Sequence, residues 1–203
     1  MNIIIATNNQ GKVKEIKKIY KTLGINFLSL RDFPKIKKIK EQFKTYEENA
    51  LQKARTISEL TNMITLADDS GIEIDAIDGK PGVFSARFGG RKISDKERNQ
   101  KILRLLKNTT EGLRKAKFVC VIAIVKPGGR QYIVKSSCNG RITEELRGKS
   151  GFGYDPIFFV SKYNKTFAEM DADLKNKISH RGKALRKAEK ILQKLTLQEK
   201  NGW

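Results

Sequence analysis

The stretch Met63-Ile64-Thr65-Leu66-Ala67-Asp68-Asp69-Ser70-Gly71 leads from a short apolar segment into two adjacent carboxylates, and a strand-like rhythm resumes after it. Charges at the end of a buried strand cost free energy unless something pairs with them. Two adjacent carboxylates also repel, so either one pKa is raised or both face a cation. In a chain with 42 Lys and Arg against 22 Asp and Glu, this acidic point is unusual. It predicts a divalent-metal site.

The composition predicts a folded, globular protein. The chain has 203 residues, of which 38% are hydrophobic and 32% are charged, and this length fits one large domain or two closely packed lobes. No apolar run reaches the roughly 20 residues that span a bilayer. The N-terminal residues lack the basic lead of a signal peptide, so we expect a cytoplasmic location. Cys120 and Cys138 have no metal-ligand spacing and are expected to be free, buried thiols.

The formal charge of +20 has two interpretations. It suggests binding to nucleic acid, or a positive field that attracts an anionic small substrate. It is equally the charge of a lysine-rich, solvated surface. The basic residues are spread along the whole chain, which favours a solvated surface that also steers an anionic substrate. We therefore expect no membrane and no specific nucleic acid as partner.

Hydrophobic periodicity predicts several strands and helices along the chain. The connection 31–44 is basic and contains a proline, so it is predicted to be a surface connection or an edge strand. The main predicted strands are 2–6, 25–30, 116–125 and 131–138, and the main predicted helices are 12–23, 45–61, 94–107 and 184–195.

Two segments of the first half are candidates for binding phosphate and metal. The loop Thr7-Asn8-Asn9-Gln10-Gly11 with Lys12 lies between a strand and a helix N-terminus, where free backbone N–H groups bind anions. It is not a Walker A loop, and an ordinary strand-to-helix turn explains it equally well. Glu48 has the capping-box spacing from Thr45. A helix cap is therefore favoured for Glu48, and a metal carboxylate is the alternative.

Two segments of the second half are candidates for binding an aromatic ligand. Glycines flank Phe152 just before Tyr154 and Asp155, so the ring offers a stacking face. A β-bulge with a core aromatic explains this pattern equally well. His180, the only histidine, is predicted to lie beside Arg181 at the start of the last helix. A lone histidine is more often structural, but its neighbours make it a candidate.

Taken together, these segments resemble the inosine triphosphate pyrophosphatase family. They occur in the family's order and cover roughly residues 2–195, so we predict one domain over 1–195 and a short tail over 196–203. Tyr46 stands where the family more often has phenylalanine. The segments that carry the resemblance are Thr7-Asn8-Asn9-Gln10-Gly11-Lys12, Tyr46-Glu47-Glu48-Asn49-Ala50, Ala67-Asp68-Asp69-Ser70-Gly71 with Pro81-Gly82-Val83-Phe84-Ser85-Ala86-Arg87, Phe152-Gly153-Tyr154-Asp155-Pro156, and Ser179-His180-Arg181.

The resemblance implies an α/β fold: a long, twisted, mixed sheet flanked by helices, with two lobes around a substrate cleft. It also implies homodimers that use Mg²⁺ to hydrolyse ITP, dITP or XTP to the monophosphate and pyrophosphate. Asp69 would be the proton acceptor and a metal ligand, with Glu48 or Asp68 assisting, and Lys12 would neutralise developing charge. The substrate would be bound by Thr7, Asn8, Asn9, Gln10, Gly11 and Lys12 at its phosphates and by Ser70, Phe152, Gly153, Tyr154, Asp155, Lys175, His180 and Arg181 around the purine.

Two other functions are compatible with parts of the sequence. A pyrophosphatase of similar fold that acts on dTTP or UTP is one, although Phe152 and the His180-Arg181 pair argue against it. A nucleic-acid-binding module without turnover is the other, and it would bind oligonucleotides less tightly as salt rises. That module leaves the Asp68-Asp69 pair unexplained, because carboxylates on a phosphate-binding face oppose binding.

Overall fold

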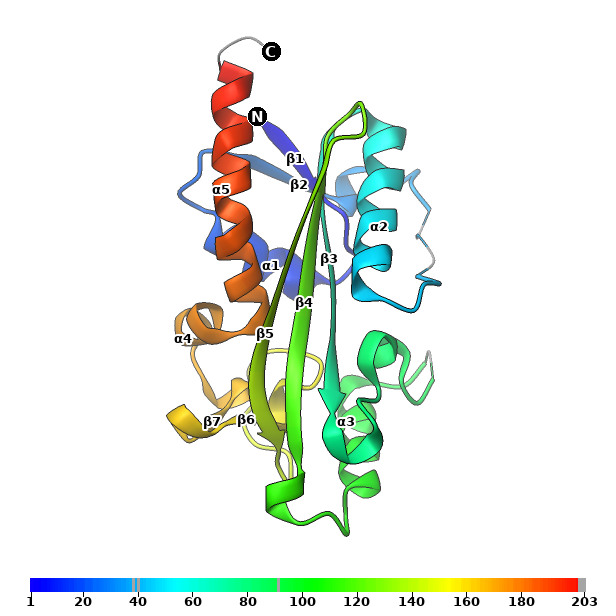
Figure 1. Cartoon of the computed structure of the whole chain (residues 1–203), viewed down its shortest axis with the longest axis vertical. Helices are drawn as coiled ribbons and strands as arrows, with labels where there is room; N and C mark the ends of the chain where they lie inside the picture. Colours follow the sequence, from blue (N-terminus) through cyan, green and yellow to red (C-terminus); the bar gives the residue numbers. More distant parts are fainter. Residues whose placement is uncertain (38, 40, 91, 201–203) are drawn as a thin grey trace. The chain divides into compact units, whose positions relative to one another are not determined.

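The computed structural model describes residues 1–37, 39, 41–90 and 92–200. Its strands form one mixed sheet in the order β2-β1-β3-β4-β5-β6-β7, and helices flank the strands (Figure 1). Strand β1 pairs parallel with β2 and β3, whereas β6 pairs antiparallel with β5 and β7. The predicted α/β fold with a mixed sheet is therefore confirmed. The strands are β1 (Asn2–Ile5), β2 (Asn26–Ser29), β3 (Ile64–Ile74), β4 (Lys115–Val125), β5 (Gln131–Ile142), β6 (Phe158–Val160) and β7 (Lys165–Thr166).

Five α-helices accompany these strands in the described part of the chain, and capping residues mark where two of them begin. Thr45 caps α2, and Ser94 forms a capping box with Glu97 at the start of α3. Both starts agree with the sequence prediction, because the hydroxyl satisfies backbone N–H groups that have no partner within the helix. The helices are α1 (Gln10–Ile19), α2 (Tyr46–Thr61), α3 (Asp95–Leu105), α4 (Ala172–Ile178) and α5 (His180–Lys200).

The chain divides into two compact units, and β3, β4 and β5 contribute residues to both. The first unit contains Met1–Asp69, Cys120–Ser136 and the chain from Arg181 onward; the second contains Ser70–Val119 and Ser137–His180. The predicted cleft between two lobes stays a prediction.

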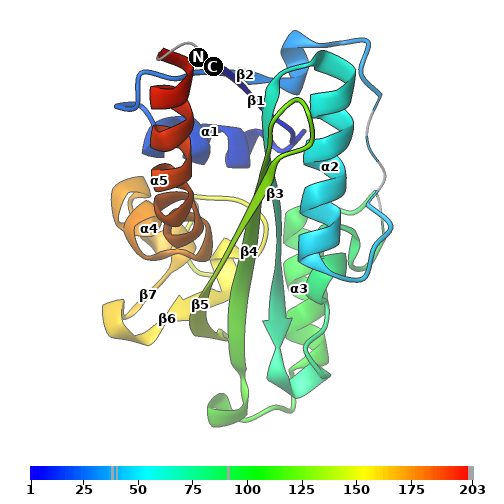
Figure 2. The same cartoon turned by 45° about the horizontal axis from the view of Figure 1, so that its top comes forward.

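In the first unit, helices pack on both faces of the strands. Buried side chains of α1 and α5 share one apolar cluster with alternate residues of β1, β3 and β4. Helix α2 lies on the opposite side of these strands from α5 (Figures 1 and 2). Tyr20, the residue directly after α1, links this helix to α5, since its hydroxyl donates to the Leu185 carbonyl at 2.6 Å. Successive residues of a strand therefore meet different helices, because side chains alternate between the faces.

The core of the second unit is rich in aromatic residues. Phe118, Phe158 and Phe167 pack against one another, with ring centroids between 4.6 and 5.8 Å apart. Ile102 of α3 and Leu106, the residue directly after this helix, belong to the same buried cluster. This cluster includes Tyr154 and so supports the connection between β5 and β6, which carries the predicted purine-binding residues Phe152, Gly153, Tyr154 and Asp155.

Several element boundaries differ from the predictions. The strand with the two carboxylates does not end at them: β3 continues to Ile74. Helix α1 begins two residues before Lys12 because Asn9 caps it. The helix α4, Ala172–Ile178, was not predicted from the sequence.

The structure also tests the predictions for the connection 31–44 and for the tail 196–203. The described part of the connection contains a short 3-10 helix, Leu30–Asp32, and no strand, so it is a surface connection. Residues 38 and 40 lie outside the described residues. Thr196, assigned to a tail from sequence, lies within α5, whereas 201–203 lie outside the described residues. No helix within the described ranges has the length and apolarity to cross a membrane.

Candidate active site

Strand β3 places the two adjacent carboxylates in separate environments. Asp68 is completely buried and Asp69 is 5% exposed. Because neighbouring side chains on a strand point to opposite faces, Asp68 contacts residues of α1 and α5, whereas Asp69 contacts a residue of α2. The sequence placed both carboxylates at the end of the strand. Their position inside it is a correction, and it makes the two groups chemically different.

Asp68 is held by cations. Lys12 forms an ion pair with Oδ1, and Arg181 Nε and Cys120 Sγ donate to Oδ2 at 3.1 and 3.0 Å. Burial by itself would raise the pKa of Asp68, but Arg181 and Lys12 outweigh it and hold this pKa far below the usual range. Asp68 is therefore ionised and fully engaged, which makes it a poor proton acceptor.

Arg181 connects this carboxylate to a second one. It is 3% exposed, and its NH1 donates to Glu15 Oε2 at 2.6 Å. Burial opposes the charge, but Asp68 and Glu15 raise the pKa of Arg181 above its usual value. The guanidinium predicted to read the purine thus binds two carboxylates of the first unit, and its purine-reading role stays a prediction. Glu15 was not predicted, because nothing in the α1 sequence separates it from a solvated glutamate.

Asp69 has one oxygen held and one free. Lys53 Nζ donates to Oδ1 at 2.9 Å, whereas Oδ2 is buried and has no hydrogen-bond partner in the described part of the chain. Burial raises the pKa of Asp69 to about 6, even though Lys53 and Lys12 act in the opposite direction. A carboxylate with a pKa near neutrality and an unengaged oxygen has the properties of a general base.

Lys53 is the residue that positions Asp69, and the sequence analysis missed it. Its ammonium group also donates to the Asp68 carbonyl at 2.7 Å and to Glu41 Oε1 at 2.6 Å. A usable signal existed, since Lys53 lies three residues after Ala50 and four before Ile57, on the apolar side of the helix. Glu41 carried no such signal, because it lies in the irregular connection.

The first loop lies at the N-terminus of α1, as predicted. The Lys12 N–H donates to Asn9 Oδ1 at 3.2 Å, and the Asn9 N–H donates to Thr7 Oγ1 at 3.2 Å. Gln10 Nε2 lies 3.4 Å from the Asn8 carbonyl. These contacts fix the loop and leave it partly exposed. The geometry suits an anion, because the N-terminus of a helix carries partial positive charge.

Glu48 makes the contacts of a helix cap. Its N–H donates to Thr45 Oγ1 at 3.2 Å, and the Thr45 hydroxyl donates to Glu48 Oε2 at 2.6 Å. The glutamate is exposed. Glu41, rather than Glu48, shares Lys53 with Asp69. A metal role for Glu48 stays a prediction.

Several of the predicted purine-binding residues lie together in the second unit, whereas Arg181 belongs to the first. Lys175 Nζ pairs with Asp155 Oδ2 at 2.5 Å and lies 4.7 Å from the centroid of the Phe152 ring. Phe152 is half-buried in a turn rather than a β-bulge. The Tyr154 hydroxyl donates to the Ser85 carbonyl at 2.8 Å, and burial raises the pKa of Tyr154 above its usual value.

His180 and Ser70 complete the predicted set. The His180 ring stacks on Phe118, with centroids 4.4 Å apart and an interplanar angle of 6°. His180 is the first residue of α5, which agrees with the predicted position at a helix start, and its side chain is buried. Ser70 lies in β3, directly after Asp69, and is partly exposed.

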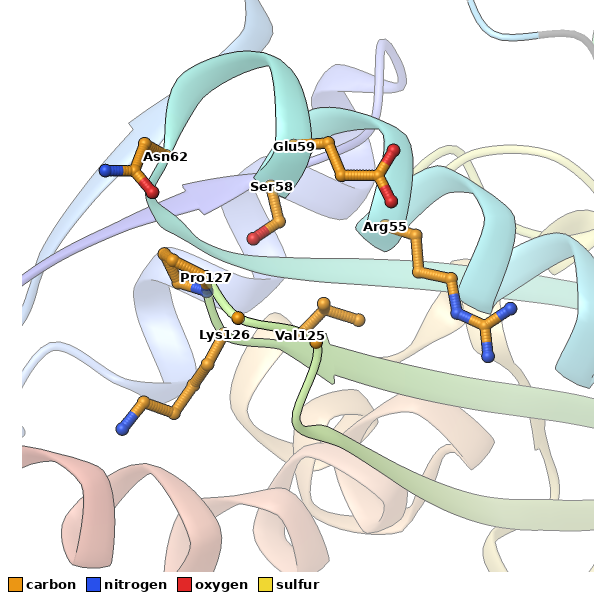
Figure 3. Close-up of a pocket in the computed structure, with 9 residues that line it drawn as sticks. Arg55, Ser58, Glu59, Asn62, Val125, Lys126 and Pro127 are labelled. Carbon is orange, nitrogen blue, oxygen red and sulfur yellow. The ribbon is translucent and has the colours of Figure 1, made fainter.

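A cavity elsewhere in the first unit is separate from all of these residues. It has a volume of about 190 Å³. Side chains from the C-terminal end of α2 face the turn between β4 and β5 across it (Figure 3). It contains none of the predicted site residues. Its lining residues are Arg55, Ser58, Glu59, Asn62, Val125, Lys126, Pro127, Gly128 and Gly129.

The mixed sheet and the two adjacent buried carboxylates, one paired with Lys12 and Arg181 and the other with Lys53, define an α/β protein with a candidate reactive carboxyl group. Comparison with known proteins is more specific: the chain belongs to the Ham1 family, whose profile matches residues 3–191. The resemblance predicted from the motifs is confirmed.

Relatives and solved structures match over almost the whole chain. A dITP/XTP pyrophosphatase of Desulforamulus reducens is 47% identical over 199 residues, which are 98% of this chain and 99% of that protein. A HAM1 protein from Coxiella burnetii is 40% identical, with a TM-score of 0.86 over 96% of this chain and 99% of that one. The Staphylococcus aureus Ham1 protein is 38% identical, with a TM-score of 0.82 over 98% and 100%.

Proposed function

We propose that this chain is a Mg²⁺-dependent pyrophosphatase that hydrolyses ITP, dITP and XTP to the monophosphate and pyrophosphate. It would thereby remove deaminated purines from the nucleotide pool. The relative from Desulforamulus reducens is named for this activity. The observation that carries the proposal is Asp69, a buried carboxylate with a pKa near 6, one oxygen held by Lys53 and one oxygen without a hydrogen-bond partner in the described ranges.

The residues present fit a magnesium ion. The buried Oδ2 of Asp69 is available as a ligand, and Glu41 is joined to Asp69 through Lys53. Within the described residues, no group of three or more His, Cys, Asp or Glu side chains could hold a metal by itself. Mg²⁺ requires no such cage, because it uses one or two carboxylates with waters and substrate phosphates. Asp69 would hold it with Glu48 or Glu41, whereas Asp68 is engaged by cations.

Asp69 acts as the proton acceptor in the proposed reaction. A water molecule attacks the α-phosphorus, Asp69 takes its proton, and pyrophosphate leaves. Because the pKa of Asp69 is about 6, most of this carboxyl group is ionised at neutral pH and able to accept the proton. The bound magnesium ion would stabilise the charge that develops on the phosphates.

The first loop binds the triphosphate in this proposal. The segment Thr7 to Lys12 leads into the N-terminus of α1, which carries partial positive charge, and Lys12 adds a positive charge beside Asp68. Anionic oxygens are stabilised at such a terminus.

The second unit recognises the base. Phe152 would stack on the purine, and Lys175, whose ammonium group lies above the Phe152 ring, would donate to the oxygen at position 6. Adenine has an amine there, which gives this donor no acceptor. Homodimeric assembly and a cytoplasmic location belong to the same proposal and rest on the resemblance.

A substrate panel tests the proposal. With Mg²⁺, the protein should release pyrophosphate and monophosphate from ITP, dITP and XTP much faster than from ATP, GTP, dTTP or UTP, and EDTA should abolish this activity. Equal turnover of ATP and GTP, or release of orthophosphate instead of pyrophosphate, would contradict the proposal.

A further inference from the structure

The loop that carries Phe152 is not fixed by strand pairing. It lies between β5 and the short 3-10 helix Asp155–Ile157. Gly151 and Gly153 both have positive φ values, 81° and 62°, a conformation that L-residues with side chains rarely adopt. A Cβ at Gly151 would also collide with the Asp155 carboxylate. The position of this loop therefore depends on contacts from other elements.

Two side chains of α3 hold both polar groups of one peptide residue in this loop. The Gly153 N–H donates to Asp95 Oδ2 at 2.7 Å, and Asn99 Nδ2 donates to the Gly153 carbonyl at 2.9 Å. Asp95 and Asn99 are four residues apart, so they lie on the same side of the helix. Together they bind Gly153 from one rigid element.

The two contacts differ in their surroundings. The Asn99 residue is 1% exposed, so its hydrogen bond is shielded from water. The Asp95 side chain is 55% exposed, and its Oδ1 also accepts from Arg98 NH1 at 3.2 Å. Arg98 is buried and donates to the Phe88 carbonyl at 3.1 Å, which orients Asp95. Loss of the acceptor for a buried or partly buried N–H costs free energy beyond the bond itself.

We propose that Asp95 and Asn99 are positioning residues that fix the Phe152 loop and thereby set the affinity for the base of the substrate. This inference rests on the proposed function, in which Phe152 stacks on the purine. Other anchors of the loop include the Phe152 N–H, which donates to Asp155 Oδ2 at 2.9 Å, the Ser150 N–H, which donates to the Ala168 carbonyl at 3.1 Å, and Tyr154, which is bound to Ser85. The α3 contacts join Gly153, next to Phe152, to a helix of 11 residues.

The proposed effect is on binding rather than on the chemical step. Stacking of a base on an aromatic side chain contributes to binding, and a displaced Phe152 loses part of that contribution. None of the α3 contacts involves Asp69. Loss of an interaction that is equal in the ground and transition states raises KM and leaves kcat unchanged.

Two variants with matched controls test this inference. Asn99→Asp turns the donor into a carboxylate that faces the Gly153 carbonyl, and Gln100→Glu places the same added charge one residue further along α3. Asp95→Ala removes the acceptor at a position where the side chain is more than half exposed, and Lys96→Ala is its truncation control. We expect both site variants to raise the KM for ITP about tenfold, which corresponds to about 1.4 kcal/mol, with kcat changed less than about threefold. The controls should match the wild type.

Product inhibition and hydrogen exchange separate this inference from the proposed function. The inhibition constant of inosine monophosphate, which carries the base, should rise about as much as KM, while that of pyrophosphate should stay constant. The amide protons of 152–155 should exchange faster in Asp95→Ala than in Lys96→Ala, whether or not the protein is active. Unchanged KM and exchange rates in an active protein would overturn the inference. Absence of ITP hydrolysis in the wild type would contradict the proposed function instead.

Discussion

Asp68 and Asp69 are neighbours in the sequence and opposites in the structure. Asp68 lies among Lys12, Arg181 and Cys120, and its pKa is far below the usual range. Asp69 lies on the other face of the same strand, and burial raises its pKa to about 6. Both are almost completely buried, so burial alone does not decide the sign of the shift. The neighbouring charges decide it: Lys12 and Arg181 contact Asp68, whereas Asp69 contacts Lys53 and is opposed by the charge of Glu41.

The comparison explains how one strand carries a structural charge and a reactive one. Burial costs each carboxylate free energy, because it removes the charge from water. Two cations offset this cost for Asp68, whereas Asp69 shares the single ammonium group of Lys53 with Glu41. Asp68 is therefore predicted to matter for stability and Asp69 for catalysis.

Replacement of the reactive carboxylate should give the largest effect. Asp69→Asn removes the proton acceptor, so kcat for pyrophosphate release from ITP should fall by about 10²–10⁴-fold, the usual contribution of a general base. The variant should stay folded, because it removes a charge that burial disfavours. Steady-state kinetics and thermal unfolding check both parts. Full activity in this variant would refute the assignment of Asp69.

Replacement of the structural carboxylate should reverse this pattern. Asp68→Asn removes the charged group that Lys12 and the buried Arg181 share and leaves Glu15 still paired with Arg181, so the free energy of unfolding should fall by about 3–5 kcal/mol. Urea denaturation of Asp68→Asn and Asp69→Asn under the same conditions makes the measurement. A larger loss in Asp69→Asn than in Asp68→Asn would show that the two roles are assigned the wrong way round.

The two carboxylates should also give opposite pH dependences of stability in metal-free protein. The folded-state pKa of Asp69 is above its unfolded value, so its contribution is fully present below pH ~3.9 and has declined by about 3 kcal/mol once the pH has risen past about 6. The folded-state pKa of Asp68 is depressed, so its contribution is present above pH ~3.9 and is lost as the pH falls.

Urea denaturation between pH 4 and 7, in EDTA, separates these contributions. The free energy of unfolding of Asp69→Asn, measured relative to the wild type, should increase across this range, because only the wild type loses the Asp69 contribution. A constant difference between the two proteins would mean that the pKa of Asp69 is not raised.

A smaller effect on the Mg²⁺ requirement should distinguish Glu41 from Glu48 as the glutamate that supports metal binding. Glu41→Gln weakens the group that shares Lys53 with Asp69, so the Mg²⁺ concentration for half-maximal activity should rise about tenfold, as is typical for groups that support a metal ligand. Glu48→Gln alters an exposed cap contact and should leave this concentration within about twofold. A greater effect of Glu48→Gln would identify Glu48 as the metal carboxylate.

Local rules in the sequence predicted much of the fold. The caps at Thr45 and Ser94 and the apolar runs of β1 and β4 are encoded by residues close together in the chain, so spacing finds them. The continuation of β3 through its carboxylates was not predictable in this way. Charged residues inside a strand contradict local preference, and only their cationic partners make the arrangement stable.

The sequence by itself determined the order of elements, the family and the identity of the central carboxylate pair, because these depend on residue type and spacing. Only the tertiary structure decided what each carboxylate faces. Arg181 lies 113 residues from Asp68, and no local pattern selects it, or Lys53, from among the many basic residues of a chain with a charge of +20. The pKa of a buried group depends on the charges that packing brings to it, and packing is a property of the whole fold.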